Sequence, residues 1–152
     1  MNKDLYCMKQ AYLEATKAYQ KNEVPVGCVI VCNDKIIARA HNLRHNLKCS
    51  LYHAEIIAIK KASKKLNTWI LDDCVMYVTL EPCLMCSGAI IQSRIKKVYY
   101  GIEMDRFGCF NEALDYFKHK QNHNVEVEKG LMKEEIEELM KNFFKELRED
   151  KN

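Results

Sequence analysis

Two segments at the ends of the chain show the hydrophobic spacing of amphipathic helices. In the first, apolar residues recur at steps of three and four, which predicts a helix that Asn2 or Asp4 caps and that ends near Asn22. Its predicted buried stripe comprises Leu5, Met8, Tyr12, Ala15 and Tyr19. In the last, residues 132–147 form one wide apolar face with Glu and Lys opposite, and we expect this helix to pack on a sheet.

Between these ends, segments rich in β-branched and aromatic residues alternate with further helices. Residues 24–32 and 35–40 flank the turn pair Asn33-Asp34, which predicts a β-hairpin. Further strands are predicted at 74–80, 97–100 and 125–127, and further helices at 53–66, from Pro82 to about Ser93, and at 111–117. We place Pro82 in the first turn of its helix, where a missing amide hydrogen costs nothing.

The alternation of strands and helices predicts an α/β fold, a three-layer α/β/α sandwich around a mixed sheet of about five strands. The later strands are joined through helices, and such parallel crossovers run right-handed. Ligand sites in sheets of this kind lie beyond the carboxyl ends of the strands, where the following helices begin.

Composition bounds the class of protein further. The 152 residues are near the usual size of one core, so we expect a single domain over residues 1–152. No apolar run reaches the roughly 20 residues of a membrane span, and the first residues lack the pattern of a signal peptide. We therefore expect a cytoplasmic protein without a membrane partner, in which most of the eight cysteines stay reduced. The expected free thiols are Cys7, Cys28, Cys32, Cys49, Cys74 and Cys109.

Two short pieces of sequence carry the candidate chemistry. His53-Ala54-Glu55 opens one predicted helix, and Cys83 and Cys86 lie three residues apart at the start of another. Zinc favours imidazole nitrogen and thiolate sulfur, and a catalytic zinc keeps a fourth position for water. Helix N-termini favour thiolate, so we expect two helix ends to converge on one Zn²⁺ held by His53, Cys83 and Cys86.

Glu55 is the candidate acid/base beside that ion. A carboxylate that lies near the zinc-activated water without binding the metal can take its proton and hand it to a substrate. A Cys-x-x-Cys pair alone is also typical of structural zinc knuckles and of redox sites. A knuckle would need a second Cys/His pair at matching spacing, whereas a redox site would need no His-x-Glu upstream.

These motifs resemble the zinc nucleobase deaminases, whose signature is H-x-E with P-C-x-x-C, and specifically the tRNA-specific adenosine deaminases. The resemblance covers essentially the whole chain. It is carried by residues 23–27, 53–56, 77–90, 93–95 and 122–127, followed by Gly130. It implies a cytidine deaminase-like fold and hydrolytic deamination of adenosine to inosine at the wobble position of tRNA anticodons.

The resemblance also implies roles for individual residues. His53, Cys83 and Cys86 would bind one Zn²⁺ per subunit, and Glu55 would activate the water and protonate first the ring nitrogen and then the leaving amine. Asn42 matches an asparagine that hydrogen-bonds the flipped base, while its alternative is a loop residue that bonds its own backbone. Val26 matches a residue that packs on the base, or is plain core. The implied partners are a tRNA anticodon stem-loop and a second copy of the chain in a homodimer.

The segment expected to approach the RNA departs from the family pattern. Met104 and Arg106 replace an aspartate and a lysine, Asp105 is displaced by one position, and Phe110-Asn111 replaces a Gly-Ser or Gly-Thr pair. Phe107 and Phe110 either stack on a flanking base or pack under the loop. The net charge of +3 is modest, and the expected basic rim comprises Arg39, Arg44, Lys48, Arg94, Lys96, Lys97 and Arg106.

Three other functions fit the same motifs. The chain can be a deaminase of a free base or nucleoside such as guanine or cytidine, which needs no basic rim. It can be the catalytic subunit of a eukaryotic-type heterodimeric tRNA deaminase, as Arg106-Phe107-Gly108 and Val26-Gly27-Cys28 suggest. Finally, it can be a non-catalytic RNA-binding or zinc-stabilised module that retains the fold.

Overall fold

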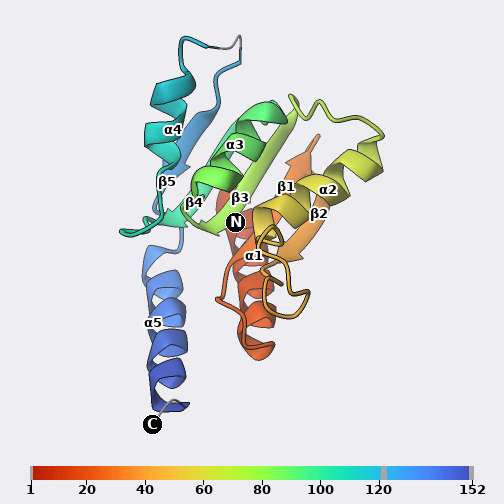
Figure 1. Ribbon diagram of the computed structural model, residues 1–152. Coiled ribbons are helices and arrows are strands. Elements are labelled where there is room, and N and C mark those ends of the chain that lie inside the picture. Colours follow the sequence, from red (N-terminus) through yellow and green to blue (C-terminus); the bar gives the residue numbers. More distant parts are fainter. Residues whose placement is uncertain (1, 121–122, 151–152) are drawn as a thin grey trace.

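The computed structural model describes residues 2–120 and 123–150, and within them five strands alternate with five helices (Figure 1). The elements are α1 (Lys3–Gln20), β1 (Gly27–Cys32), β2 (Lys35–His41), α2 (Ala54–Leu66), β3 (Cys74–Leu80), α3 (Leu84–Gln92), β4 (Lys97–Ile102), α4 (Phe110–Phe117), β5 (Glu126–Lys129) and α5 (Lys133–Asp150).

The strands form one mixed sheet in the order β2-β1-β3-β4-β5. Strand β1 is antiparallel to both β2 and β3, and β3, β4 and β5 run parallel. Helices α2, α3 and α4 pack on one face of the sheet, and α1 with the start of α5 packs on the other (Figure 1). The predicted three-layer sandwich around a five-stranded sheet is therefore confirmed.

Alternate side chains of the central strands supply the two halves of the core. In β3, Met76 and Val78 face the helices α2 and α3, whereas Tyr77 faces α1. Residues two apart point to the same face of a strand, so the continuous apolar run of β3 buries both faces. The run was predicted as a strand over residues 74–80, and this is confirmed.

Helix α1 buries a face that overlaps the predicted stripe only in part, at Met8 and Ala15. Asn2 caps the helix, as expected, by accepting from Asp4 N and Leu5 N. However, Leu5 is 40% exposed, and the buried apolar residues are Cys7, Met8, Ala11, Ala15 and Ala18. The reason is close approach, since a Cβ added to Gly27 of β1 would lie 1.9 Å from the Ala11 carbonyl oxygen. Only small side chains fit between helix and strand at that distance.

Both prolines lie just before the elements that follow them. Pro25 precedes β1, which starts at Gly27. Pro82 was predicted in the first turn of α3, and this was wrong, because the helix starts at Leu84 and Cys83 is its N-cap with an extended backbone. The consequence matters for the site, since Cys83 itself stands at the helix N-terminus.

Helix α5 packs on the sheet only through its first half. Ile136 is fully buried near Gly101 of β4, and Phe143 packs edge-on against Tyr19 of α1 with ring centroids 5.6 Å apart. Phe144 and Leu147 are 36% and 40% exposed, because the helix extends past the sheet (Figure 1). The prediction that this helix packs on the sheet is therefore confirmed for its first half. None of the helices in the described residues combines the length and apolar character needed to cross a bilayer.

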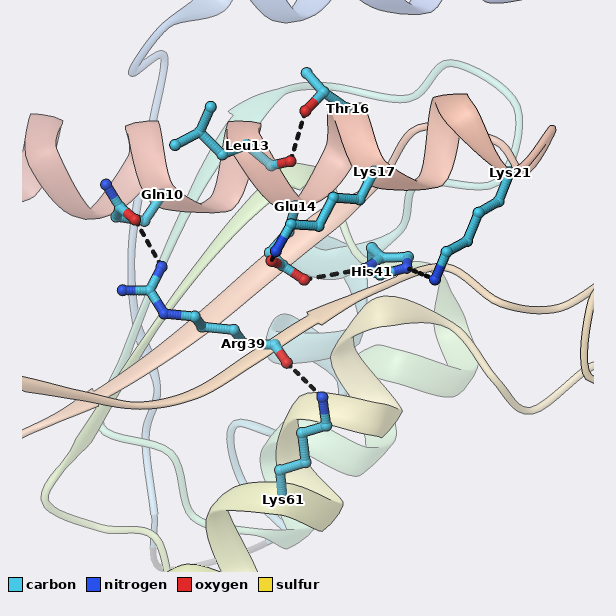
Figure 2. Close-up of polar contacts among 9 residues, drawn as sticks. All are labelled: Gln10, Leu13, Glu14, Thr16, Lys17, Lys21, Arg39, His41 and Lys61. Carbon is cyan, nitrogen blue, oxygen red and sulfur yellow. Dashed lines mark hydrogen bonds and ion pairs between the residues drawn. The ribbon is translucent and has the colours of Figure 1, made fainter.

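Polar contacts tie the edge strand β2 to the helices on both faces (Figure 2). On one side, Glu14 of α1 lies 3.0 Å from His41 Nδ1, and the Arg39 guanidinium donates to Gln10. On the other side, Lys61 Nζ of α2 donates to the Arg39 carbonyl oxygen at 2.7 Å. An edge strand has hydrogen-bonding groups unpaired on one side, so these contacts help to fix its position.

Candidate active site

The helices α2 and α3 begin at the same edge of the sheet. Strands β2 and β3 run in the same direction, and each leads from its carboxyl end towards one of these helices. His53 is the N-cap of α2 and Cys83 the N-cap of α3, and neither side chain caps its own helix. Both side chains are thus available to each other, as expected for two helix ends that converge.

The three proposed ligand atoms form a compact group. His53 Nδ1 lies 3.7 Å from Cys83 Sγ and 3.5 Å from Cys86 Sγ. Zinc bonds of about 2.3 Å to sulfur and about 2.0–2.1 Å to nitrogen at a tetrahedral angle separate these atoms by about 3.6 Å. Within residues 2–120 and 123–150, this is the one group of three or more such side chains close enough to hold a metal. The donor set and its spacing fit zinc.

The pKa values of the Cys83 and Cys86 thiols are strongly shifted in this group. The hydrogen bond from Cys86, helped by His53, lowers the pKa of Cys83 to about 4 against the opposing effect of burial. Hydrogen bonding to Cys83 and burial raise the pKa of Cys86, and the Cys83 sulfur raises the pKa of His53. A cation between the sulfurs would favour the thiolate form of both.

Glu55 is the second residue of α2 and lies beside this group without being part of it. Its side chain is only 4% exposed. Burial raises the pKa of Glu55 to about 7, although neighbouring donors, Cys86 and His53 oppose the shift. A carboxyl with a pKa near neutrality can both accept and return a proton under physiological conditions. The surroundings of Glu55 thus suit an acid/base.

These residues line a pocket of about 470 Å³. Val26 and Asn42 form part of the same wall. The Asn42 side chain donates to the Val24 carbonyl oxygen at 3.3 Å and accepts from the Arg44 amide at 3.1 Å. Asn42 therefore braces its own loop and also lines the pocket, while its hydrogen bond to a base stays a prediction.

The two phenylalanines of the departing segment have different surroundings. Phe110 is fully buried at the start of α4 and packs edge-on against Tyr100. Phe107 is 60% exposed and lines the pocket together with Met104. Of the two, only Phe107 has a ring face open to a ligand.

The expected basic rim is mostly elsewhere. Arg44 lines the pocket and Arg106 lies in the adjacent loop over the Phe107 ring. In contrast, Arg94 lies over the Trp69 ring and Lys97 pairs with Glu128, both at the amino end of β4. The prediction that the basic residues cluster at the mouth of the pocket was wrong for Arg94 and Lys97. They lie at the amino end of β4, whereas the pocket lies beyond the carboxyl ends of the strands.

Several pocket residues were not predicted from the sequence, among them Leu80, Glu81, His45 and Phe144. Glu81 directly precedes Pro82 in the motif, and that position was a usable signal. Phe144 comes from α5, more than fifty residues further along the chain, and its spacing assigned it to a core face. No local pattern predicts that the last helix reaches this pocket.

Comparison with known proteins agrees with this arrangement. A family model for the MafB19-like deaminases matches residues 1–148. A solved structure from a study of A-to-I editing by tRNA:A34 deaminases at the wobble position of transfer RNA superposes with a TM-score of 0.82 at 36% identity, covering 88% of this chain and 98% of that one. A guanine deaminase from Nitrosomonas europaea shares the fold with a TM-score of 0.80 at 21% identity, over 91% of this chain and 83% of its own.

Curated relatives extend the match to the whole sequence. The tRNA-specific adenosine deaminase of Bacillus subtilis (strain 168) is 45% identical over 99% of this chain and 94% of its own length. That of Rickettsia bellii (strain RML369-C) is 43% identical over 93% of this chain and all of its own. The deaminase family model matches nearly the full length of the chain, and the relatives are 43–45% identical over almost all of it. The chain therefore belongs to the tRNA-specific adenosine deaminases.

Proposed function

We propose that this chain catalyses the hydrolytic deamination of adenosine to inosine at the wobble position of tRNA anticodons. The observation that carries the proposal is the meeting of the His53, Cys83 and Cys86 ligand atoms beside the buried Glu55 in one pocket. Near full-length similarity to proteins named tRNA-specific adenosine deaminase supports the choice of substrate. In this proposal residues 1–152 act as one deaminase domain.

The residues of the chain divide the chemistry between them. His53 Nδ1 and the sulfurs of Cys83 and Cys86 would hold one Zn²⁺. When bound, the ion supplies Lewis acidity that lowers the pKa of a water molecule to about 7. Glu55 would take one proton from the attacking water and deliver it to N1 of adenine as the new C6–O bond forms. It would then take the proton of the new C6 hydroxyl and deliver it to the departing amine, so that the C6–N6 bond breaks, ammonia leaves and inosine remains. Its raised pKa suits both directions of transfer.

The pocket wall and rim would hold the substrate. Asn42 offers amide donor and acceptor groups to the base, and Val26 offers an apolar surface beneath it. Phe107 on the rim can stack on a neighbouring base, since every base has a π-face. Arg44 and Arg106 supply positive charge for the phosphates of an anticodon stem-loop.

A homodimer is part of the proposal. Leu51 and Leu84 each lie within two residues of a proposed zinc ligand, and they are 55% and 66% exposed. Two leucines so exposed beside a site suit contact with a second copy of the chain. The chain would work in the cytoplasm, where tRNA is found and where the free thiols, which include all eight cysteines, stay reduced.

A guanine deaminase is the second candidate function. A solved guanine deaminase from Bacillus subtilis is 35% identical, covers 80% of this chain and 76% of its own, and has a TM-score of 0.65. A free base would fill the pocket without using the basic rim. The two candidate functions therefore differ in whether the enzyme needs contacts with the RNA around the base or only with the base itself.

Turnover of competing substrates tests the proposal. An anticodon stem-loop with adenosine at the wobble position is compared with free adenosine, guanine and cytidine, with the inosine formed and the zinc content of the protein measured together. We expect one zinc per chain and the highest kcat/KM on the stem-loop. Faster turnover of any free compound would contradict the proposal.

A further inference from the structure

Two loops border the pocket, and each is held by a buried carboxylate, of which Glu81 also lines the pocket. Residues 42–52 form the first loop and residues 103–109 the second. Glu23 is fully buried beneath the first loop, and Glu81, 8% exposed, lies beneath the second. Neither side chain has a role in the deamination steps described above. A buried carboxylate is costly unless it is well hydrogen-bonded, so their partners show what they do.

Glu81 gathers backbone amides from both ends of the second loop. Its Oε1 accepts from the Met104 amide at 3.2 Å, and its Oε2 accepts from the Phe110 amide at 3.1 Å. The same loop touches the zinc segment directly, since Gly108 forms an isolated antiparallel bridge with Cys83. One side chain thus closes the loop that presents Met104 to the pocket.

Gly108 shows how closely this loop lies on the carboxylate. A Cβ added there would be 2.4 Å from Glu81 Oε1 and 2.5 Å from the Met104 carbonyl oxygen. Any larger residue would therefore push the loop away from Glu81. A substitution at Gly108 can therefore disturb the contact between this loop and Glu81 without changing Glu81 itself.

Glu23 acts in the same way on the first loop. Its Oε1 accepts from the His45 amide at 3.0 Å, while its Oε2 accepts from the Asn46 amide at 2.7 Å and from Asn46 Nδ2 at 2.8 Å. Burial alone would raise the pKa of Glu23, but these hydrogen bonds outweigh it and hold the pKa below the ordinary value. This loop carries Asn42, Arg44 and His45, which line the pocket.

We propose that Glu23 and Glu81 are positioning residues that fix the two rim loops and so set the affinity for a substrate that reaches beyond the pocket. The inference rests on the proposed function for the identity of that substrate, an RNA strand. The two carboxylates act on KM for the stem-loop through the loops, and they leave the proposed zinc ligands and Glu55 in place. A free nucleoside, which touches less of the rim, depends on them less.

Glu81→Gln is the first test. The amide keeps the size of the side chain, but its NH₂ faces a backbone N–H in place of an acceptor. We expect KM for the stem-loop to rise by about tenfold with kcat and zinc content unchanged, because a loop displaced by a fraction of an ångström loses oriented contacts. In hydrogen exchange, the Met104 and Phe110 amides should lose protection while the amides of α2 keep theirs.

A second variant and a control make the result specific. Gly108→Ala disturbs the same contact from the loop side, so it should reproduce the phenotype of Glu81→Gln, and the double variant should be less than additive. Glu103→Gln removes one carboxylate from the same loop, but Glu103 is exposed and pairs only with Lys129. It should leave KM and the exchange of Met104 and Phe110 unchanged.

The first loop is tested separately. Glu23→Gln should raise KM and expose the His45 and Asn46 amides, and Asn46→Ala, which removes one of the three bonds, should do so more weakly. Combined with Glu81→Gln, the effects of Glu23→Gln should multiply, because the two loops are distinct. Lost zinc, unchanged exchange in these amides, or an equal rise in KM for free adenosine would overturn the inference. If the wild type fails to deaminate the stem-loop, the proposed function fails, while exchange and zinc content still decide the positioning role.

Discussion

The two ends of strand β3 each carry a pair of neighbouring cysteines in very different surroundings. Beyond the carboxyl end, Cys83 and Cys86 lie at a helix N-terminus with His53 Nδ1 within 3.7 Å of both sulfurs. At the amino end, Cys74 begins the strand and is the antiparallel partner of Cys32 in β1. The residue types are the same, and both pairs bring two sulfurs together.

The surroundings shift the pKa of one cysteine in each pair, Cys83 and Cys74, in opposite directions. At the carboxyl end, the hydrogen bond from Cys86 together with His53 lowers the pKa of Cys83 to about 4. At the amino end, burial, reinforced by Cys32 and by the negative charges of Asp73 and Asp72, raises the pKa of Cys74 to about 12. Thiolate binds metal and thiol does not. Paired cysteines become candidate ligands where donors and a helix N-terminus favour the anion.

Matched serine substitutions give the largest effect and test this contrast directly. Cys83→Ser should abolish zinc binding and reduce deamination to the uncatalysed level, because the Lewis acid is lost. Cys74→Ser should keep one zinc and full activity, at a cost of about 1–3 kcal/mol in the free energy of unfolding, since a hydroxyl replaces a buried thiol. Metal analysis, kinetics and denaturant unfolding measure the three quantities. Loss of zinc in both variants would show that the two ends are not distinct.

Glu55→Gln separates chemistry from metal binding at the carboxyl end. The variant should retain zinc and fold, while kcat falls by roughly 10²–10⁴-fold, because the amide cannot carry the proton from the water to the base. His53→Ala is the comparison, and it should lose zinc together with activity. Retained turnover in Glu55→Gln would remove this residue from its proposed role.

Spacing along the chain was enough to predict the elements around β3 and the convergence of two helix ends. The run 74–80 is apolar on both faces, and His53 and Cys83 each follow a predicted strand. These features are local, so periodicity and the order of elements determine them. The helix start at Leu84 was missed by a small margin, because Pro82 is compatible with several positions near a helix N-terminus.

Contacts between distant segments could not be predicted in this way. The contrast between Cys83 and Cys74 depends on which charges and hydrogen bonds surround each sulfur after folding. Phe144 likewise joins the pocket only because α5 extends past the sheet, and Arg94 leaves the expected rim because β4 begins at the far edge. The type and spacing of a residue predict which face of its helix or strand it occupies. Its contacts with distant segments are set by tertiary packing and cannot be predicted from spacing.

Removing a positive charge at the pocket should weaken RNA binding more than removing one at the opposite ends of the strands, and this difference should be smaller but measurable. Arg44 lines the pocket, and Arg94 lies over Trp69 near the amino end of β4. Arg44→Ala should weaken stem-loop binding and reduce the slope of log K against log salt concentration by about 1, because one phosphate contact is lost. Arg94→Ala removes the same charge and should leave that slope unchanged. Equal slopes for both variants would mean that net charge, and not its place, sets RNA binding.

The smallest effect on activity is expected from the contact of Glu14 with His41, which lies at the carboxyl end of β2 on the α1 face (Figure 2). The hydrogen bond to His41, with help from Lys17 and against burial, lowers the pKa of Glu14 from 4.5 to about 2. A lowered pKa in the folded state stabilises the fold above the unfolded value, and this stabilisation disappears as the pH falls through the folded value. Glu14→Gln should therefore unfold more easily by roughly 2 kcal/mol near pH 7.

The difference between wild type and Glu14→Gln should shrink as the pH falls from 4.5 towards 2. Urea unfolding at a series of pH values measures it, with zinc content followed in parallel. Since Glu14 contacts none of the pocket residues through its hydrogen bonds, the zinc content should not change. A difference that stays constant across this pH range would assign the contribution of Glu14 to packing. The contact between Glu14 and His41 would then stabilise the fold by filling space between α1 and β2, and not through charge.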